Sequence, residues 1–240
     1  MRRVKITLAY DGGPFHGWQV QPALPTIQGL LEEILSGIEG VPVHVAGSGR
    51  TDAGVHALEQ VAAFTLVNPI PVENLRRAVN RLLPPAVRVL SAQEVDAGFH
   101  PRFQAKAKTY EYRIFREEVC SPFEWPYVHH YPYRLEENRM MQLACALEGE
   151  HDFTAFAAAD DRDAEGKSKV RTVFSSELCR TGPHLIYRVR GSGFLKHMVR
   201  NLIGTLIEAG KGNIANLDVL PAKSGPTAPA KGLFLVNVEY

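Results

Sequence analysis

The residues best suited to chemistry in this 240-residue chain are an arginine and an aspartate held two positions apart in a glycine-rich loop. Residues 47–57 read Gly-Ser-Gly-Arg-Thr-Asp-Ala-Gly-Val-His-Ala, so Arg50 and Asp52 lie among three glycines. Glycine allows backbone conformations closed to other residues and lets a ligand approach the chain closely. Because an ionised aspartate can act as nucleophile or base, Asp52 is a candidate catalytic residue. Turn geometry alone is the other explanation for this composition.

Several better-known sites are excluded by the same residues. The sixth position of the would-be GxGxxG pattern is Asp52, and no P-loop lysine or amphipathic helix follows it. Neither Ser48 nor Ser192 lies in a GxSxG nucleophile elbow. His129 and His130 are adjacent and have no cysteine or carboxylate at ligand spacing, and HExxH does not occur. The sequence therefore predicts no metal site.

Cations gather on a second segment, where apolar periodicity predicts a helix over residues 194–209. Its apolar side would bury Phe194 and Leu195, and its polar side would carry Lys196, His197, Arg200 and Asn201. A solvated helix face is the ordinary explanation for such residues. The functional alternative is that Arg200 approaches Asp52 and keeps its carboxylate ionised.

The elements that must position these residues follow one order twice. In the first part, the pattern predicts a strand, a helix from the N-cap Thr26 to Gly40, two strands, a helix and a strand, over residues 4–10, 27–39, 41–46, 58–66, 71–83 and 87–95. In the second, the strands and helices are predicted from residue 109 and over residues 135–147, 170–179, 185–190, 194–209 and 233–240. Both orders are βαββαβ.

This order predicts an α+β protein of two ferredoxin-like (RRM-like) halves. Such halves place helices on one face of an antiparallel sheet, so the opposite faces are left to form a central cleft. We expect a first half over residues 1–96 that carries the Asp52 loop, and a linker over 97–108. A second half over 109–240 would carry Tyr110 and the basic helix. Because its strand alternates cleanly, Tyr110 could equally be a core aromatic.

The charges are balanced in total but segregated along the chain. Lys plus Arg number 27 against 26 Asp plus Glu, which argues against a wholesale basic nucleic-acid binder. Yet residues 100–116 carry five basic residues against one acid, residues 186–200 carry four against none, and residues 148–165 carry seven acids against one arginine. Basic strands interleaved with aromatic residues suit a groove for phosphates and stacked bases; the aromatic residues are Phe99, Phe103, Tyr110 and Tyr112. Solvation of an outer sheet face is the alternative.

Cysteine usage and hydropathy indicate the cellular compartment of the protein. The three cysteines form no CxxC pair and their number is odd, which suits a reducing compartment. No apolar run at the N-terminus is long enough for a signal peptide, and none approaches the roughly 20 residues of a membrane span. We therefore expect a cytoplasmic protein.

Six blocks of sequence resemble the bacterial tRNA pseudouridine synthase A family in order and spacing. They are YDG at residues 10–12, FHGWQ at 15–19, GRTDAGVHA at 49–57, KTY at 108–110, GFLKHMVRN at 193–201 and TAPAKGL at 227–233. The resemblance covers essentially the whole chain and implies the pseudouridine synthase fold. It implies conversion of uridine to pseudouridine in the anticodon stem-loop of tRNA, at about positions 38 to 40, without cofactor or metal. The resemblance also implies a homodimer in which one tRNA contacts both subunits.

Roles for single residues follow from the same resemblance. Asp52 would be the catalytic nucleophile or base, and Arg200 its ion-pair partner. Tyr110 would stack on the target base and is a candidate for handling the C5 proton. Arg50 would support the flipped nucleotide. Lys108, Lys196 and His197 complete the expected substrate-binding set.

Two other functions remain open at this level. A non-catalytic RNA-binding module would need only the basic and aromatic strands, although an aspartate beside the groove repels phosphate and so favours the enzyme. An aspartate-dependent hydrolase of small substrates would turn over without RNA and would respond little to salt.

Overall fold

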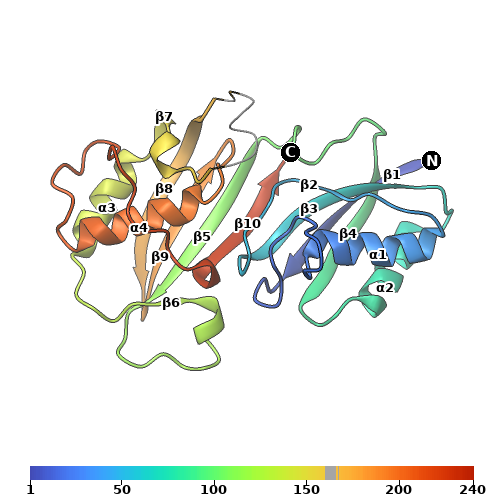
Figure 1. The fold of residues 1–240 in the computed structure, drawn as a ribbon, viewed down its shortest axis with the longest axis horizontal. Coiled ribbons are helices and arrows are strands. Elements are labelled where there is room, and N and C mark those ends of the chain that lie inside the picture. The colour runs from blue at the N-terminus through green and yellow to red at the C-terminus, as the bar shows by residue number, and fades with distance from the viewer. Residues whose placement is uncertain (160–165, 167) are drawn as a thin grey trace. The chain divides into compact units, whose positions relative to one another are not determined.

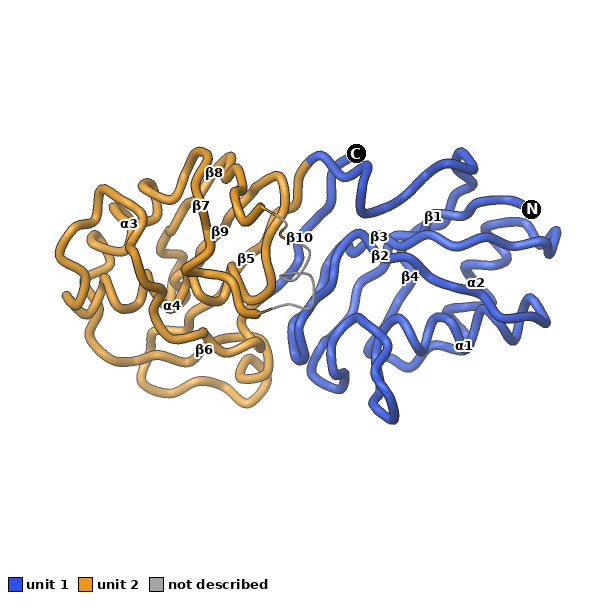
Figure 2. Tube along the Cα trace, turned by 45° about the horizontal axis from the view of Figure 1, so that its top comes forward, with its two compact units in different colours: residues 1–106, 234–240 blue, residues 107–233 orange. Residues whose placement is uncertain are grey.

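The computed structural model of the chain describes residues 1–159, 166 and 168–240 and divides it into two units. Unit 1 comprises Met1–Lys106 and Phe234–Tyr240, and unit 2 comprises Ala107–Leu233 (Figure 2). The last strand, β10 (Leu233–Glu239), belongs almost entirely to unit 1, and so do residues 97–106 of the expected linker. β10 pairs in parallel with β3 (His56–Leu66) at Phe234 and Leu235.

Unit 1 is a sheet with two helices, as the apolar pattern predicts (Figure 1). Its strands run in the order β4 (Val87–Val95), β1 (Arg2–Tyr10), β3 and β10, and β1 is antiparallel to both β3 and β4. Alternate residues of β1 are buried, namely Val4, Ile6, Leu8 and Tyr10. The helices α1 (Ile27–Glu39) and α2 (Val72–Leu82) bury one apolar side each. The predicted helix signals hold for α1, since the Thr26 side chain accepts from Gly29 N and Gly40 is left-handed with φ 81°.

One predicted strand of this unit is wrong. Residues 41–45 are not a strand, and β2 is limited to Ala46–Gly47. The apolar alternation is real, since Val43 and Val45 are buried. Their backbone N–H groups, however, donate to side chains of α1, at 2.9 Å to Ser36 Oγ and 3.0 Å to Glu32 Oε1. Helix side chains thus satisfy the donors that a sheet would otherwise pair.

Unit 2 is an antiparallel sheet against which two helices pack. Its strands run β5 (Ala107–Phe115), β9 (His184–Gly191), β8 (Val170–Thr181) and β7 (Gly149–Asp152), and the short β6 (His129–His130) adds to β5. The helices α3 (Glu137–Ala146) and α4 (Met198–Gly210) lie side by side over β8 and β9 (Figure 1). The core between them contains Tyr112, Ile114, Leu185, Tyr187, Val189, Leu202 and Leu206.

The predicted helix over 194–209 begins four residues late, at Met198. His197, at its N-cap, has a left-handed backbone with φ 62°, which is incompatible with a helix continuing through it. Phe194 and Leu195 are accordingly only half-buried, contrary to expectation. Asn201 was expected on the solvated side but is buried, because it donates to Phe156 O and accepts from Thr227 Oγ1.

The predicted α+β class is confirmed, and the sheets are mostly antiparallel; β3–β10 and β5–β6 are parallel pairs. Among the described residues, no helix combines the length and apolar character needed to cross a membrane.

Candidate active site

The Asp52 loop lies in unit 1, between β2 and β3. Arg50 is exposed and Asp52 is half-exposed, whereas Thr51 between them is buried. The chain turns directly after the carboxylate, since Asp52 O accepts from Val55 N at 3.1 Å. The loop therefore presents a cation and a carboxylate outward on either side of a buried residue.

Glycines of the preceding segment pack against the loop backbone. Gly17 has φ +90°, and a Cβ there would lie 2.6 Å from Thr51 O; a Cβ on Gly12 would lie 2.0 Å from Val55 O. Trp18 N donates to the same Thr51 oxygen at 3.0 Å. Only glycine permits such backbone contact, so residues 12–18 act as a fitted support for the loop.

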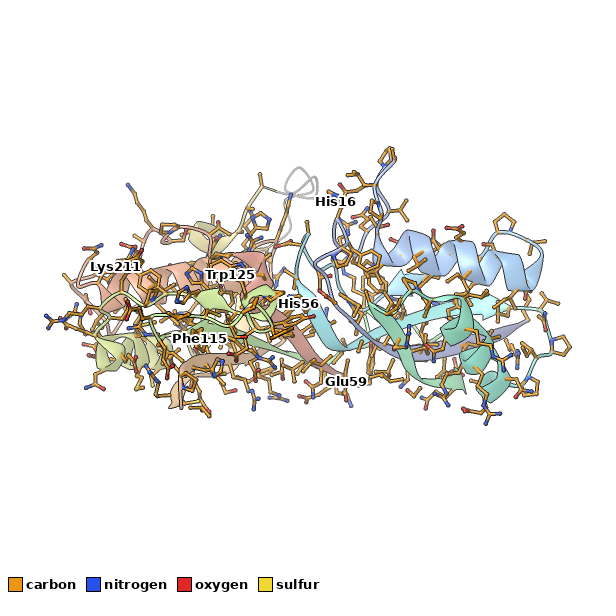
Figure 3. The ribbon with its side chains drawn as sticks, turned by 90° about the horizontal axis from the view of Figure 1, so that it is seen from below. His16, His56, Glu59, Phe115, Trp125 and Lys211 are labelled. Carbon is orange, nitrogen blue, oxygen red and sulfur yellow. The ribbon has the colours of Figure 1, made fainter. Side chains whose placement is uncertain are left out.

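His56 follows the Asp52 loop as the first residue of β3 and lies in the core of unit 1. It is 2% exposed, its Nδ1 accepts from Gly12 N at 3.1 Å, and Asp11 Oδ1 lies 3.1 Å from the same nitrogen. Its ring stacks on Phe234 with 4.7 Å between centroids. His56 is labelled in Figure 3. The end of β1, the start of β3 and β10 thus meet at one buried histidine.

Tyr110 lies on β5 of unit 2, opposite Val189 of β9. Its side chain is buried at 8% exposure and meets the edge of Phe194 at 5.2 Å between centroids. Lys108 and Tyr112 lie on the same face of the strand, two residues to either side. Tyr112 is wholly buried, and burial raises the pKa of its hydroxyl while the nearby Arg200 lowers it. Tyr112, which was expected in the groove, is therefore a core residue. Tyr110, for which a core role was the alternative, is buried in large part.

Arg200 is held by residues 225–232, which we call the C-terminal strap. Arg200 Nε donates to Ala228 O at 2.8 Å, and Ala228 N donates to Arg200 O at 3.1 Å. The strap is in turn fixed to β5, because Tyr112 OH donates to Pro229 O at 2.8 Å. A Cβ on Gly232 would lie 2.9 Å from the Tyr112 ring. Ala228 therefore holds Arg200 twice, once at the guanidinium Nε and once at the backbone oxygen.

The remaining expected binding residues lie just before α4. Lys196 is exposed, and its Nζ donates to Ala159 O at 3.0 Å. His197 is half-buried in the left-handed conformation described above. A non-glycine residue in that region is strained, and such strain concentrates at functional sites. Unit 1 thus holds Arg50 and Asp52, and unit 2 holds Lys108, Tyr110, Lys196, His197 and Arg200.

Part of the predicted basic groove is neutralised within unit 2. Glu111 is buried and paired with Arg113 at 2.8 Å and with Arg188 at 2.6 Å. Burial favours a higher pKa for Glu111, but the hydrogen bonds from Arg188 and Arg113 hold its pKa below the usual value. Arg116 pairs with Glu137 at 3.4 Å. Arg113, Arg116 and Arg188 of the two basic segments thus bind carboxylates of the protein.

Of the aromatic residues expected in the groove, some pack against the protein and others are exposed. Phe99 packs on Tyr240 at 5.2 Å between centroids, and Lys5 Nζ lies 5.6 Å from its ring. Phe103, by contrast, is 76% exposed. Of the acidic residues expected over 148–165, Asp160, Asp161, Asp163 and Glu165 lie outside the described residues.

The residues that support Arg200 were not identified from the sequence. Ala228 lies in the family block at residues 227–233 and Gly204 lies inside α4, but neither position by itself indicated a link to Arg200. Within the described part of the chain, no three histidine, cysteine or acidic side chains gather as metal ligands.

Comparison with known proteins identifies the family of the chain. The family model described as tRNA pseudouridine synthase matches residues 6–104 and 143–240. A curated relative from Solibacter usitatus (strain Ellin6076), named tRNA pseudouridine synthase A, is 78% identical over the whole of both chains. Relatives of the same name from Lacticaseibacillus casei (strain BL23) and Brevibacillus brevis (strain 47 / JCM 6285 / NBRC 100599) are 43% and 42% identical, again over the whole of both chains. The chain therefore belongs to the tRNA pseudouridine synthase family and is an isomerase that acts on RNA.

Proposed function

We propose that this protein converts uridine to pseudouridine in the anticodon stem-loop of tRNA, at about positions 38 to 40, with Asp52 as the catalytic carboxylate. The observation that carries this is the Asp52 loop, where a half-exposed carboxylate and an exposed guanidinium project from a tightly supported backbone in a chain of this family. The reaction is an isomerisation: the bond from ribose C1′ to uracil N1 breaks, the base turns, and a bond to C5 forms. The C5 proton is lost and N1 gains one.

Asp52 serves as nucleophile or base in this scheme, and both roles need the ionised form. Arg200 supplies the opposite charge that keeps it ionised. The hydrogen bond from Arg200 Nε to Ala228 O supports this role, because a guanidinium that is already held loses little conformational entropy on pairing. The proposal requires the two units to bring these side chains together when the enzyme is active.

The other site residues receive the target nucleotide. Tyr110 stacks on the uracil and handles the C5 proton, and Arg50 supports the nucleotide after it has left the helical stack. Lys108, Lys196 and His197 contact the RNA around it. Pairing of two subunits would let the basic segments of both chains contact one tRNA, so we propose a homodimer as the working form.

Asp52→Asn is the decisive variant, because it keeps the size of the side chain and removes its charge. We expect it to fold and to bind tRNA, yet to form no pseudouridine. The measurement is release of tritium from C5-labelled uridine in unmodified tRNA, since each turnover frees that hydrogen. Labelled tRNAs in which single anticodon-stem uridines are replaced would identify the target. Turnover by the variant at the wild-type rate would remove Asp52 from its central role.

The competing functions give different results in the same assay. A binding module would retain tRNA without releasing tritium, and a small-substrate hydrolase would act without RNA. RNA binding should also weaken steeply with salt, as phosphate counterions are displaced.

A further inference from the structure

A buried chain of polar side chains lies directly beneath the Asp52 loop in unit 1. It comprises Ser48, Gln60, Tyr10 and Thr51, whose exposures are 0%, 0%, 4% and 6%. Tyr10 ends β1, Gln60 lies inside β3, and Ser48 and Thr51 belong to the loop itself. Four polar side chains in a core need a reason to be there, since each must find partners within the protein.

Hydrogen bonds connect the four side chains in sequence. Ser48 Oγ donates to Gln60 Oε1 at 2.6 Å, and Gln60 Nε2 donates to Tyr10 Oη at 3.4 Å. Tyr10 Oη lies 2.9 Å from Thr51 Oγ1, and either hydroxyl can be the donor of that bond. The amide orientation of Gln60 is fixed independently, since Val61 N donates to Oε1 at 3.1 Å.

The chain attaches to the loop on both sides of Arg50. Gln60 Nε2 also donates to Gly49 O at 3.1 Å, which fixes the residue before Arg50. Tyr10 fixes the side chain of Thr51, the residue between Arg50 and Asp52. Thr51 O accepts from Trp18 N, so both oxygens of that residue are hydrogen-bonded. Burial raises the pKa of Tyr10 to about 12, so its hydroxyl remains protonated throughout the working range.

We propose that Tyr10 and Gln60 are positioning residues that set the direction of the Arg50 and Asp52 side chains from beneath the loop. The inference deepens the proposed function and rests on it, because it takes Asp52 as the catalytic carboxylate. Neither positioning residue touches the substrate. Their effect passes through Thr51 and Gly49, and a displacement of the carboxylate by about 1 Å is enough to cost a large part of the rate.

The test removes one hydroxyl at a time while keeping side-chain shape. Tyr10→Phe and Thr51→Val each delete the bond between the two residues, and Thr51→Ser retains it. Unit 2 offers a matched control: Tyr187 is 0% exposed, and its hydroxyl lies 2.9 Å from Ser176 Oγ. Tyr187→Phe therefore deletes a buried hydroxyl pair of the same length away from the loop. Melting temperatures of all variants separate loss of fold from loss of rate.

We expect tritium release at saturating tRNA to fall at least about tenfold in Tyr10→Phe and Thr51→Val, with KM for tRNA within about twofold of wild type. The double variant should be no slower than either single one, because all three lack the same bond. Thr51→Ser should recover most of the rate, and Tyr187→Phe should keep it.

Two results would overturn the inference. If Tyr10→Phe and Thr51→Val turn over as fast as Tyr187→Phe, or if they raise KM and leave kcat unchanged, the chain beneath the loop does not position the carboxylate. Asp52→Asn in the same series separates this failure from that of the proposed function. An inactive Asp52→Asn beside a fully active Tyr10→Phe removes only the positioning role, whereas an active Asp52→Asn removes both.

Discussion

Tyr110 combines a ring and a hydroxyl whose contributions to the reaction can be separated. We expect Tyr110→Phe to keep the ring in contact with Phe194, and so to preserve KM for tRNA. Loss of the hydroxyl should lower kcat by about 10²- to 10⁴-fold, the usual contribution of a positioned acid or base. Tyr110→Ala should lose the ring as well and raise KM. Tritium release over a range of tRNA concentrations measures both constants; an unchanged kcat in Tyr110→Phe would leave the tyrosine with stacking alone.

Single residues were predicted from the sequence where their chemistry is local. Asp52 and Arg50 could be identified because a glycine-rich loop with charged residues is visible in a few consecutive letters. Gln60 and Tyr10 could not, because each looks like an ordinary strand residue and its role follows only from hydrogen bonds to positions 11 to 50 residues away. Asn201 was misassigned for a related reason, since its partners are on distant segments.

Among the elements, α4 and the C-terminal strap make close backbone contact at Gly204. A Cβ on Gly204 would lie 1.7 Å from Pro226 O, so Gly204→Ala should force the strap away from the helix. We expect this to destabilise unit 2 by about 3 kcal/mol and to lower activity further by releasing Ala228 from Arg200. Chemical denaturation and tritium release on the folded fraction measure the two effects separately.

A glycine of α1 provides the control for that substitution. Gly37 is exposed, and a Cβ there meets nothing within 4 Å. Gly37→Ala should therefore stabilise the protein by about 0.5 to 1 kcal/mol, the ordinary gain in helix propensity. If both substitutions had the same small effect, the close contact at Gly204 would not hold the strap.

Regular elements were predicted well where periodicity and end signals agree. β4 was predicted with its observed bounds, and α1 begins and ends at the predicted capping residues. The exceptions are segments whose backbone is satisfied from elsewhere. Residues 41–45 have a strand pattern but donate to α1, and the α4 pattern extends back through Leu195 although the left-handed His197 delays the helix. Periodicity records which side of a segment is buried, and it does not record what bonds the backbone makes.

At the scale of the whole molecule, the balance of charge hides two populations of cations. Arg113, Arg116 and Arg188 are bound to Glu111 or Glu137 and stabilise unit 2. Others in the same segments are exposed, Lys106 and Lys196 among them. A count of charges along the sequence cannot distinguish the two, because the distinction depends on which acid faces which strand. A cation that is already paired with a carboxylate of the protein has less charge to offer an RNA phosphate, so the paired arginines should contribute less to counterion release.

Lys106 and Arg113 test this division, since both lie in the basic segment over residues 100–116. Lys106→Ala should weaken tRNA binding and reduce the slope of log K against log salt by about 0.7 to 1, because one cation fewer would neutralise a phosphate. Arg113→Ala should leave the slope unchanged, because that charge is already paired with Glu111 and Arg188 still holds the carboxylate. Filter binding from low to high salt measures both slopes. Equal slopes for Lys106→Ala and wild type would place the RNA elsewhere on the protein, and a reduced slope for Arg113→Ala would mean that RNA displaces the Glu111 pair.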